Sequence, residues 1–492
     1  MTREVIAGRV FLRAIGVLGA FQAGVMLANL IRVKLVAVEV GPTGVGLQTL
    51  IDQIVVFVSL GFTFSMPFAA VKYLSYAHDE EGRAFARAFA AFRRVLTVMS
   101  LVGLAAAGTL ALVAPDLFGG EVADNADLLL IALAAIPVVN LMALVTQAIA
   151  ASGRATTAAA LTLAHWTMVA VLAGGGLLLD GLRGYFIGVG AATGLVLVAG
   201  GAYLRRAERT QDRGGRVRTL AELRRHPGVL RFALVQSVLT LTTPLAYLVA
   251  RYAVLGDGGL EDAGLLAASL GIAQALTSLL NPANALLLTP ALNLADPPEV
   301  KLGHMLEYRR AALAMLAVGM LPALLFPEVV LRVLFDAEFV PASDYVYLFV
   351  LSEAFVVVSA IHQALLIGLD DFAVNVTYVL VGQLVMVVLI VVLVPGMGVA
   401  GVGVAMIGYH ALVLALTTRR LWRRHRMATR RGLGGRTLGL VAGLAAIGAI
   451  VPTLPSDDPL LIVVRAVLLA LLAAAGSVLA YRATAPIAGK AS

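Results

Sequence analysis

Two arginines in apolar sequence are the residues best placed to do chemistry. Arg32 lies near the end of the first long apolar segment, with Lys34 two residues beyond it. Arg251 lies near the end of the seventh segment, roughly 220 positions later, as in an internal repeat. A charge at bilayer depth costs about 2.5–3.5 kcal/mol even on the lenient insertion scale, so it normally faces a cavity or a partner. Cations at matching places in two halves therefore predict a central site that binds an anion.

Polar residues share helical faces with these cations. In the seventh segment a spacing of three and four residues aligns Thr243 and Tyr247 with Arg251 on one face. The second segment carries Gln48 and Asp52 one helical turn apart. The eighth segment contributes Asn281 to a similar stripe. Such stripes line a binding cavity or pack helix against helix, and the sequence leaves both interpretations open.

Two first-segment cations compete for the same role. Helical periodicity places Arg32 on a broad polar face with Gln22 and Asn29, whereas Lys34 points away from that face. Periodicity therefore favours Arg32 as the cavity residue unless the helix bends near its end. For Arg251 the competing interpretation is a side chain that snorkels to the outer headgroups or forms an internal ion pair.

The composition excludes a soluble protein. Of 492 residues, 60% are hydrophobic and 13% are charged. Apolar segments long enough to cross a bilayer number about fourteen, the last two at 437–454 and 459–481. Cysteine is absent, so disulfides, thiolate metal sites and cysteine nucleophiles are excluded. We predict an all-α integral membrane protein with about 14 transmembrane helices.

Charge placement predicts the topology. Arginines cluster at 205–231 and 419–436, whereas acidic residues cluster at 116–127, 257–262 and 328–344. Under the positive-inside rule the basic loops and both termini lie in the cytoplasm. The expected location is the cytoplasmic (inner) membrane. The net charge of +8 is therefore interpreted as a response to anionic lipid rather than to nucleic acid.

Two halves of the chain repeat at an offset of about 216–220 residues, in the parallel arrangement of some transporters. Gly181 and Gly184 recur as Gly398 and Gly401. We therefore expect two pseudo-symmetric six-helix lobes plus a C-terminal helix pair. The expected boundaries are 1–204 for the N-terminal lobe, 205–228 for a basic cytoplasmic linker, 229–420 for the C-terminal lobe and 421–492 for a basic loop with the extra helix pair.

Other titratable groups are few in the apolar segments. Glu353 is a candidate proton carrier, and His165 and His362 are expected to be satisfied by neighbouring helices. Asp370 and Asp371 form a short turn without the second carboxylate motif that a metal site would need. The sequence predicts no catalytic residues and no cofactor, and it does not distinguish a proton from sodium as a coupling ion.

Several motifs resemble one family. Lys34-Leu35-Val36-Ala37, Gly41-Pro42-Thr43-Gly44, Gln48 and Val71-Lys72-Tyr73 resemble the start of Wzx-type O-antigen flippases, within the multidrug/oligosaccharidyl-lipid/polysaccharide exporter (MOP) superfamily. Pro395-Gly396 with Gly398 and Gly401 is similar to the family's entry to the twelfth span. The resemblance covers about residues 10–420. The chain departs from the family at Ala267-Ala268, which replace an aromatic–glutamine pair, and it adds a terminal helix pair beyond the twelve spans.

The resemblance implies a function. Such flippases move undecaprenyl-diphosphate-linked oligosaccharide from the inner to the outer leaflet, in company with polysaccharide polymerase machinery. It implies that Lys34 and Arg251 engage the diphosphate and that Lys72 meets the headgroup. One alternative is a cation-coupled multidrug exporter of the same superfamily. A second alternative, a membrane glycan polymerase or ligase, would need a substantial outer loop, and the sequence has none.

Overall fold

A computed structural model of the chain describes residues 3–67, 69–70, 73–74, 82–208, 228–278, 288, 292, 297–426 and 443. Every element in this part of the chain is helical. By their contacts the residues fall into two units, one of residues 20–252 and one of residues 1–19 with 253–492. The segment 229–252, which we expected in the second lobe, groups with the first unit. The lobe boundaries drawn from the sequence remain predictions.

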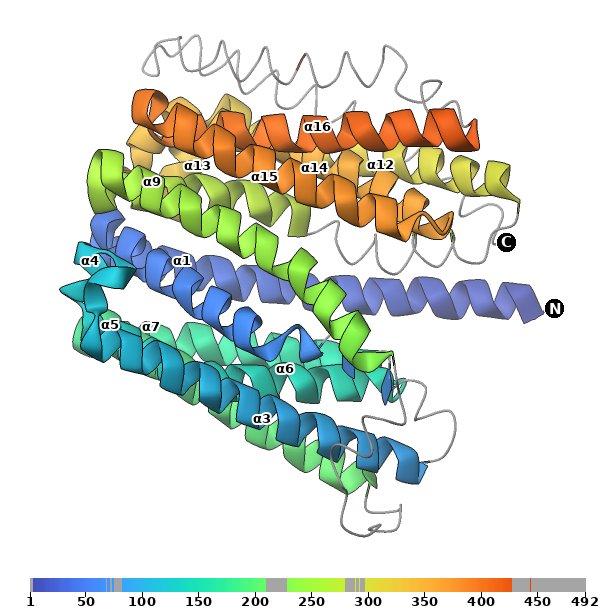
Figure 1. Ribbon diagram of the computed structural model, residues 1–492, viewed down its shortest axis with the longest axis horizontal. Coiled ribbons are helices and arrows are strands. Elements are labelled where there is room, and N and C mark those ends of the chain that lie inside the picture. The colour runs from blue at the N-terminus through green and yellow to red at the C-terminus, as the bar shows by residue number, and fades with distance from the viewer. Residues whose placement is uncertain are drawn as a thin grey trace. The chain divides into compact units, whose positions relative to one another are not determined.

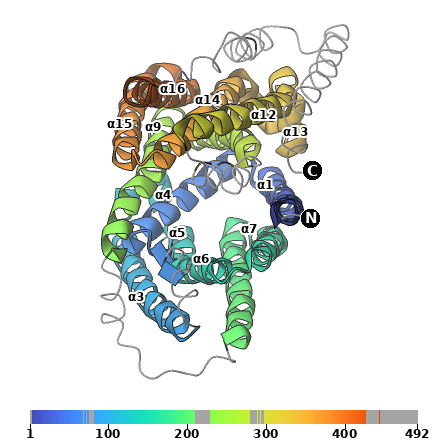
Figure 2. The same cartoon turned by 90° about the vertical axis from the view of Figure 1, so that its right-hand side faces the viewer.

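The unit of residues 20–252 contains most of the candidate residues. Its long helices are α1 (Arg3–Thr63), α3 (Gly82–Val113), α5 (Ala126–Ala134), α6 (Ile136–Ala151), α7 (Ala155–Glu208) and the first half of α9 (Val229–Ser278). Two short helices, η1 (Pro115–Phe118) and α4 (Gly120–Ala123), connect α3 to α5. Figures 1 and 2 show α3, α6 and α7 side by side, and their contacts agree. These three helices form the packed layer of this unit.

Glycine kinks divide the longest helices into pairs. The backbone breaks at Gly41 in α1, at Asp180 and Gly181 in α7, and at Gly259 in α9. Each glycine has a positive φ of 57° to 77°, which side-chain-bearing residues adopt only with strain. Each kink therefore marks a sharp reversal between two spans rather than a gentle bend.

The second unit consists of antiparallel helices as well. It contains the end of α9, then α12 (Pro298–Leu325), α13 (Pro327–Leu334), η3 (Ala337–Ala342), α14 (Ser343–Gly368), α15 (Phe372–Met397) and α16 (Val399–His425). Helix α14 packs against both α12 and α16, and α15 packs against α16 (Figure 1). Val350, Val358 and Leu365 of α14 are buried in this packing.

The described helices confirm the multi-pass prediction. Nine helices in the described ranges are long and apolar enough to cross a membrane. Three of these nine contain a glycine kink and therefore hold two spans each. Dividing them accounts for the first twelve predicted spans. The predicted spans 437–454 and 459–481 lie outside the described residues, apart from Gly443.

The kinks also recur at the predicted repeat distance. Gly259 follows Gly41, and Gly398 follows Gly181, at the offset of about 216–220 residues that the sequence repeat shows. All four glycines have φ between 54° and 77° and stand where one span reverses into the next. The repeated glycines therefore encode equivalent backbone geometry in both halves of the chain.

Candidate functional site

Arg32 occupies a polar cluster within the unit of residues 20–252. Its Nε donates a hydrogen bond to Asn29 Oδ1 at 3.2 Å, one turn earlier in α1. Its Nη1 donates to the hydroxyl of Tyr185, which comes from the second half of α7. The guanidinium carbon lies 5.5 Å from the centre of the Trp166 ring, a cation–π distance. Arg32 is therefore held by helical partners on both sides.

Gln48 links this cluster to the carboxylate of Asp52. The side-chain amide of Gln48 donates to Asp52 Oδ2 and lies 3.4 Å from the Tyr185 hydroxyl. Gln48 is 5% exposed and Tyr185 is fully buried. A buried tyrosine needs a partner for its hydroxyl, and here that oxygen joins two helices. Gln48 and Asp52, which the sequence places one helical turn apart, are thus joined by a hydrogen bond.

Arg251 approaches the same carboxylate from α9. Its Nη1 donates to Thr49 Oγ1 at 2.8 Å, while its Nε is buried with no hydrogen-bond partner in the described chain. Both Arg251 and Arg32 interact electrostatically with Asp52. Neither arginine forms a direct ion pair with Asp52 among the described residues. The two cations thus lie near one carboxylate, and other side chains hold them in place.

Close packing of glycines in α7 positions Tyr185 in this cluster. A Cβ added at Gly184 would lie 2.0 Å from the carbonyl oxygen of Gly176, and one added at Gly188 would lie 2.3 Å from that of Leu172. The two halves of α7 therefore meet backbone against backbone, which only glycine permits. Tyr185 follows Gly184 directly, so this contact fixes its position.

The charge balance of the cluster suits an anionic ligand. Two arginines face one aspartate, which leaves an excess of one positive charge before Lys34 is counted. Guanidinium groups bind phosphate and carboxylate oxygens with paired donors, and these bonds are strong where water is scarce. No group of three or more histidine, cysteine or acidic side chains suited to a metal was found among the described residues. The cluster is therefore a candidate anion site rather than a candidate metal site.

The remaining predicted residues divide into three groups. Tyr247 lies close enough to Arg251 to interact electrostatically, so it belongs to the same region. Lys34 and Thr243 are described and have interactions of their own, so their assignment to the site stays a prediction. Lys72 and Asn281 lie outside the described residues. The predicted face of α9 is thus only partly tied to the site.

Sequence reasoning missed the residues that bridge the helices. Tyr185, Thr49 and Trp166 contact the arginines, yet none of them belongs to a polar stripe that the sequence analysis identified. A usable signal was present for one of them, because Tyr185 directly follows one of the repeated glycines. A tyrosine at a close helix contact is expected to bring its hydroxyl to a partner.

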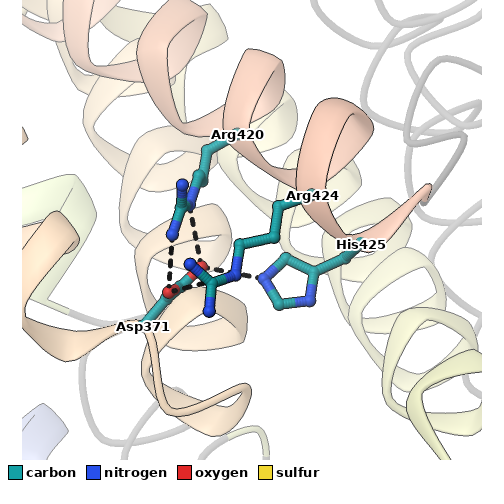
Figure 3. Close-up of polar contacts among 4 residues, drawn as sticks. All are labelled: Asp371, Arg420, Arg424 and His425. Atoms are coloured by element: carbon teal, nitrogen blue, oxygen red, sulfur yellow. Dashed lines mark hydrogen bonds and ion pairs between the residues drawn. The ribbon is translucent and has the colours of Figure 1, made fainter.

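A second charged cluster lies in the other unit, at the turn between α14 and α15. Arg420 donates from Nε and Nη2 to the two carboxylate oxygens of Asp371, both at 2.9 Å. His425 Nε2 lies 2.8 Å from Oδ2, and Arg424 Nε lies 4.0 Å from Oδ1. Figure 3 shows the three basic side chains of α16 converging on this one carboxylate. The hydrogen bonds from Arg420 hold the pKa of Asp371 at about 2, well below its ordinary value.

Other buried ionisable groups have varied surroundings. His165 is satisfied by Thr193 Oγ1 at 3.1 Å, from the second half of α7, as predicted. His362 Nδ1 is hydrogen-bonded to Val358 of its own helix, and its Nε2 has no hydrogen-bond partner among the described residues, so its expected contact with a neighbouring helix is not seen there. Glu353 has a hydrogen bond with Thr277. The buried guanidinium of Arg309, which the sequence did not single out, has no hydrogen-bond partner in the described chain.

Comparison with solved structures gives the class of fold. The chain is similar to the lipid II flippase MurJ in an inward closed conformation, with a TM-score of 0.65, 13% identity and coverage of 94% of this chain and 99% of that one. It is also similar to an inward-facing multidrug resistance MATE transporter of the MOP superfamily, with a TM-score of 0.62, 15% identity and coverage of 86% and 95%.

A third similar structure is a MOP superfamily transporter from Pyrococcus furiosus described by the reverse polarity of its binding pocket. The TM-score is 0.57, the identity 16%, and the coverage 88% of this chain and 99% of that one. No protein-family model and no curated protein matches the sequence. The chain therefore has the all-helical fold of MOP superfamily transporters. Its substrate does not follow from that fold.

Proposed function

We propose that the chain is a flippase for undecaprenyl-diphosphate-linked oligosaccharide, an O-antigen-like repeat unit. It would move this lipid from the inner to the outer leaflet of the cytoplasmic membrane by alternating access. The proposed lobes 1–204 and 229–420 rock against each other, while the prenyl chain stays in lipid. Both termini lie in the cytoplasm in this proposal, and polysaccharide polymerase machinery would use the product.

The observation that carries this proposal is the excess of positive charge around Asp52. Arg32 and Arg251 come from different helices, α1 and α9, and approach the same region. A diphosphate carries enough oxygen atoms to engage both guanidinium groups at once. The unpartnered Nε of Arg251 is one donor that a bound anion would satisfy.

The carboxylate of Asp52 has a role in this scheme. With no ligand bound, Asp52 offsets one of the two positive charges and limits the desolvation penalty of the pair. Because no direct ion pair forms, an incoming diphosphate can contact the arginines without first breaking one. Gln48 and Tyr185 fix the geometry of Arg32 and Asp52 during this exchange.

Similarity to a known flippase supports the proposal. A lipid II flippase shares the fold over almost the whole chain. The substrate proposed here is also a lipid moved between leaflets. The sequence motifs around Lys34 and Gly41-Pro42 add the resemblance to Wzx-type flippases.

The test is glycan export in a strain that depends on this chain. Arg251→Gln and Arg32→Gln should each lower export at least tenfold at normal protein levels. Arg183→Gln is the matched control, because Arg183 is exposed and lies on α7 only two residues from Tyr185. Export at the wild-type level in both site variants would contradict the proposal.

The second candidate function is a cation-coupled multidrug exporter. It is favoured by the similarity to MATE structures and by the presence of a carboxylate, Asp52, in the cluster. Deletion of the gene separates the two candidates. Loss of glycan export with unchanged drug resistance supports the flippase, and increased sensitivity to cationic drugs with normal export supports the exporter.

A further inference from the structure

A cleft on the outside of the unit of residues 20–252 lies apart from the arginine cluster. It has a volume of about 430 Å³ and is lined by α3, α6 and α7. Most of its surface is apolar, formed by side chains such as Leu144 and Val145 at its floor and Val198 at its rim. Its size falls within the range of small-molecule and lipid-chain sites.

Two arginines stand at this cleft. Arg93 comes from the N-terminal part of α3 and Arg205 from the C-terminal end of α7. Both are exposed, and neither forms a hydrogen bond or ion pair through its side chain in the described chain. The two charges thus lie in the N-terminal half of α3 and in the last turn of α7, and apolar surface continues along the flanks of these helices.

The location within the membrane follows from the sequence. Arg205 begins the basic cluster 205–231, and Arg93 lies in the stretch 72–94, which also carries several basic residues. The positive-inside rule assigns both segments to the cytoplasm. The cleft brings these two segments to the same end of the helical layer, as that topology requires. The arginines thus lie at the predicted height of the inner-leaflet headgroups, and the apolar part of the cleft lies along the acyl chains.

We infer that this cleft binds an anionic phospholipid of the inner leaflet. Its phosphate sits between Arg93 and Arg205, and one acyl chain lies over Leu144 and Val145. A basic pocket between transmembrane helices on the cytoplasmic side is the arrangement that selects anionic headgroups. The charge pair selects an anionic lipid over a zwitterionic one, and the apolar surface distinguishes a lipid from free phosphate.

Gly201 offers a way to test the apolar part separately. It lines the cleft, and an added Cβ would meet nothing within 4 Å. Leucine is also a better helix former than glycine, so Gly201→Leu fills the cleft without weakening α7. The charged part is tested by the double variant Arg93→Gln/Arg205→Gln.

The matched control is Arg94→Gln/Arg206→Gln. These residues are the immediate neighbours of the cleft arginines, they are exposed, and they do not line the cleft. The control therefore removes the same charge from the same two helices, α3 and α7. It separates binding in the cleft from general attraction to a basic surface.

The experiment is native mass spectrometry of the purified, delipidated full chain. Phosphatidylglycerol and phosphatidylcholine with identical acyl chains are titrated separately. The wild type and the control should bind the first phosphatidylglycerol about thirtyfold more tightly than phosphatidylcholine, since two arginines at about 1 kcal/mol each contribute about 2 kcal/mol. Arg93→Gln/Arg205→Gln should abolish this preference, and Gly201→Leu should weaken both lipids.

Several outcomes would overturn the inference. If Arg93→Gln/Arg205→Gln and Arg94→Gln/Arg206→Gln lose the preference for phosphatidylglycerol equally, the preference comes from general surface charge and not from the cleft. Displacement of the phospholipid by inorganic phosphate, or by undecaprenyl phosphate at equal concentration, would assign the cleft to a soluble anion or to the transport substrate. A dimer that disappears in Gly201→Leu would make the cleft an interface between copies. If the Gln variant does not fold, Arg93→Lys/Arg205→Lys should retain the preference, and its loss would contradict the inference.

Discussion

The chain contains two clusters in which basic side chains surround one aspartate, and they are built differently. At Asp371, Arg420 forms two bonds of 2.9 Å and His425 a third contact of 2.8 Å. At Asp52, the arginines are held by Tyr185 and Thr49 instead, and neither forms an ion pair with the carboxylate. The cluster at Asp371 pairs its charges with one another, and we call it the closed cluster. The cluster at Asp52 does not, and we call it the open cluster.

This difference separates a structural contact from a candidate binding site. The Asp371 cluster joins the α14–α15 turn to the end of α16, where bidentate geometry fixes one arrangement (Figure 3). In the Asp52 cluster, neutral side chains position the cations, and a buried nitrogen of the Arg251 guanidinium has no hydrogen-bond partner among the described residues. Charge that is positioned but not neutralised is available to a ligand. The predictions below test this contrast.

The largest effect is expected for charge reversal in the open cluster. Arg251→Glu places a second carboxylate near Asp52, so it should repel a diphosphate and lower glycan export at least 100-fold. A hydrogen bond from a charged donor to the ligand contributes about 1.5–3 kcal/mol, and repulsion of the diphosphate by the new carboxylate adds to that loss. Export is measured in a deletion strain at matched protein levels. Export above one tenth of the wild-type rate would mean that the diphosphate does not bind at the Asp52 cluster.

A smaller effect is expected from loss of the bridging hydroxyl. Tyr185→Phe removes the acceptor for Arg32 and Gln48 while it keeps the ring. A hydrogen bond to a charged group contributes about 1.5–3 kcal/mol, so export should fall about 10-fold or more. Phe186→Leu, which changes the adjacent buried ring without removing a polar group, is the control. Equal effects of both substitutions would mean that Tyr185 acts only by packing.

The closed cluster should affect stability more than transport. Asp371→Asn weakens the contacts with Arg420 and His425, and we expect about 1 kcal/mol of destabilisation, as for a partly exposed ion pair. Export should change less than twofold. Thermal unfolding in detergent measures the stability, and Asp370→Asn is the neighbouring control. Loss of export without loss of stability would give Asp371 a role in transport.

The pH dependence of the closed cluster has a definite sign. The folded pKa of Asp371 is lowered to about 2, whereas the unfolded value is about 3.9. A lowered acid pKa stabilises the folded state above the unfolded value and loses that contribution as pH falls toward the folded value. The melting-temperature difference between wild type and Asp371→Asn should therefore be constant from about pH 8 to about pH 5 and shrink below about pH 4. A difference that shrinks above pH 5 would contradict this assignment.

Much of the fold was predictable because spans and reversals have local causes. Apolar length predicted the first twelve spans. The repeated glycines predicted equivalent reversals, since positive φ at Gly181 and Gly398 is a local backbone requirement. In the site, Gln48 and Asp52 were predictable because they lie one turn apart on a single helix.

The rest of the site depends on contacts between distant segments. Tyr185 reaches Arg32 only because Gly176 and Gly184 bring the two halves of α7 together. Periodicity favoured Arg32 over Lys34 as the cavity residue, and that choice stays a prediction, whereas the contacts of Arg32 with Tyr185 and Trp166 join segments far apart in the sequence. The periodicity of one segment does not predict which tyrosine or threonine in it will contact an arginine from another helix.

The account rests on the claim that the Asp52 cluster binds an anion. The direct measurement is calorimetric titration of the purified full chain with farnesyl diphosphate, a soluble short-chain relative of the proposed lipid. We predict binding to the wild type and to Arg183→Gln, and at least tenfold weaker binding to Arg251→Gln and to Arg32→Gln. Equal binding to all four proteins, or binding of a cationic dye in place of the diphosphate, would contradict the claim.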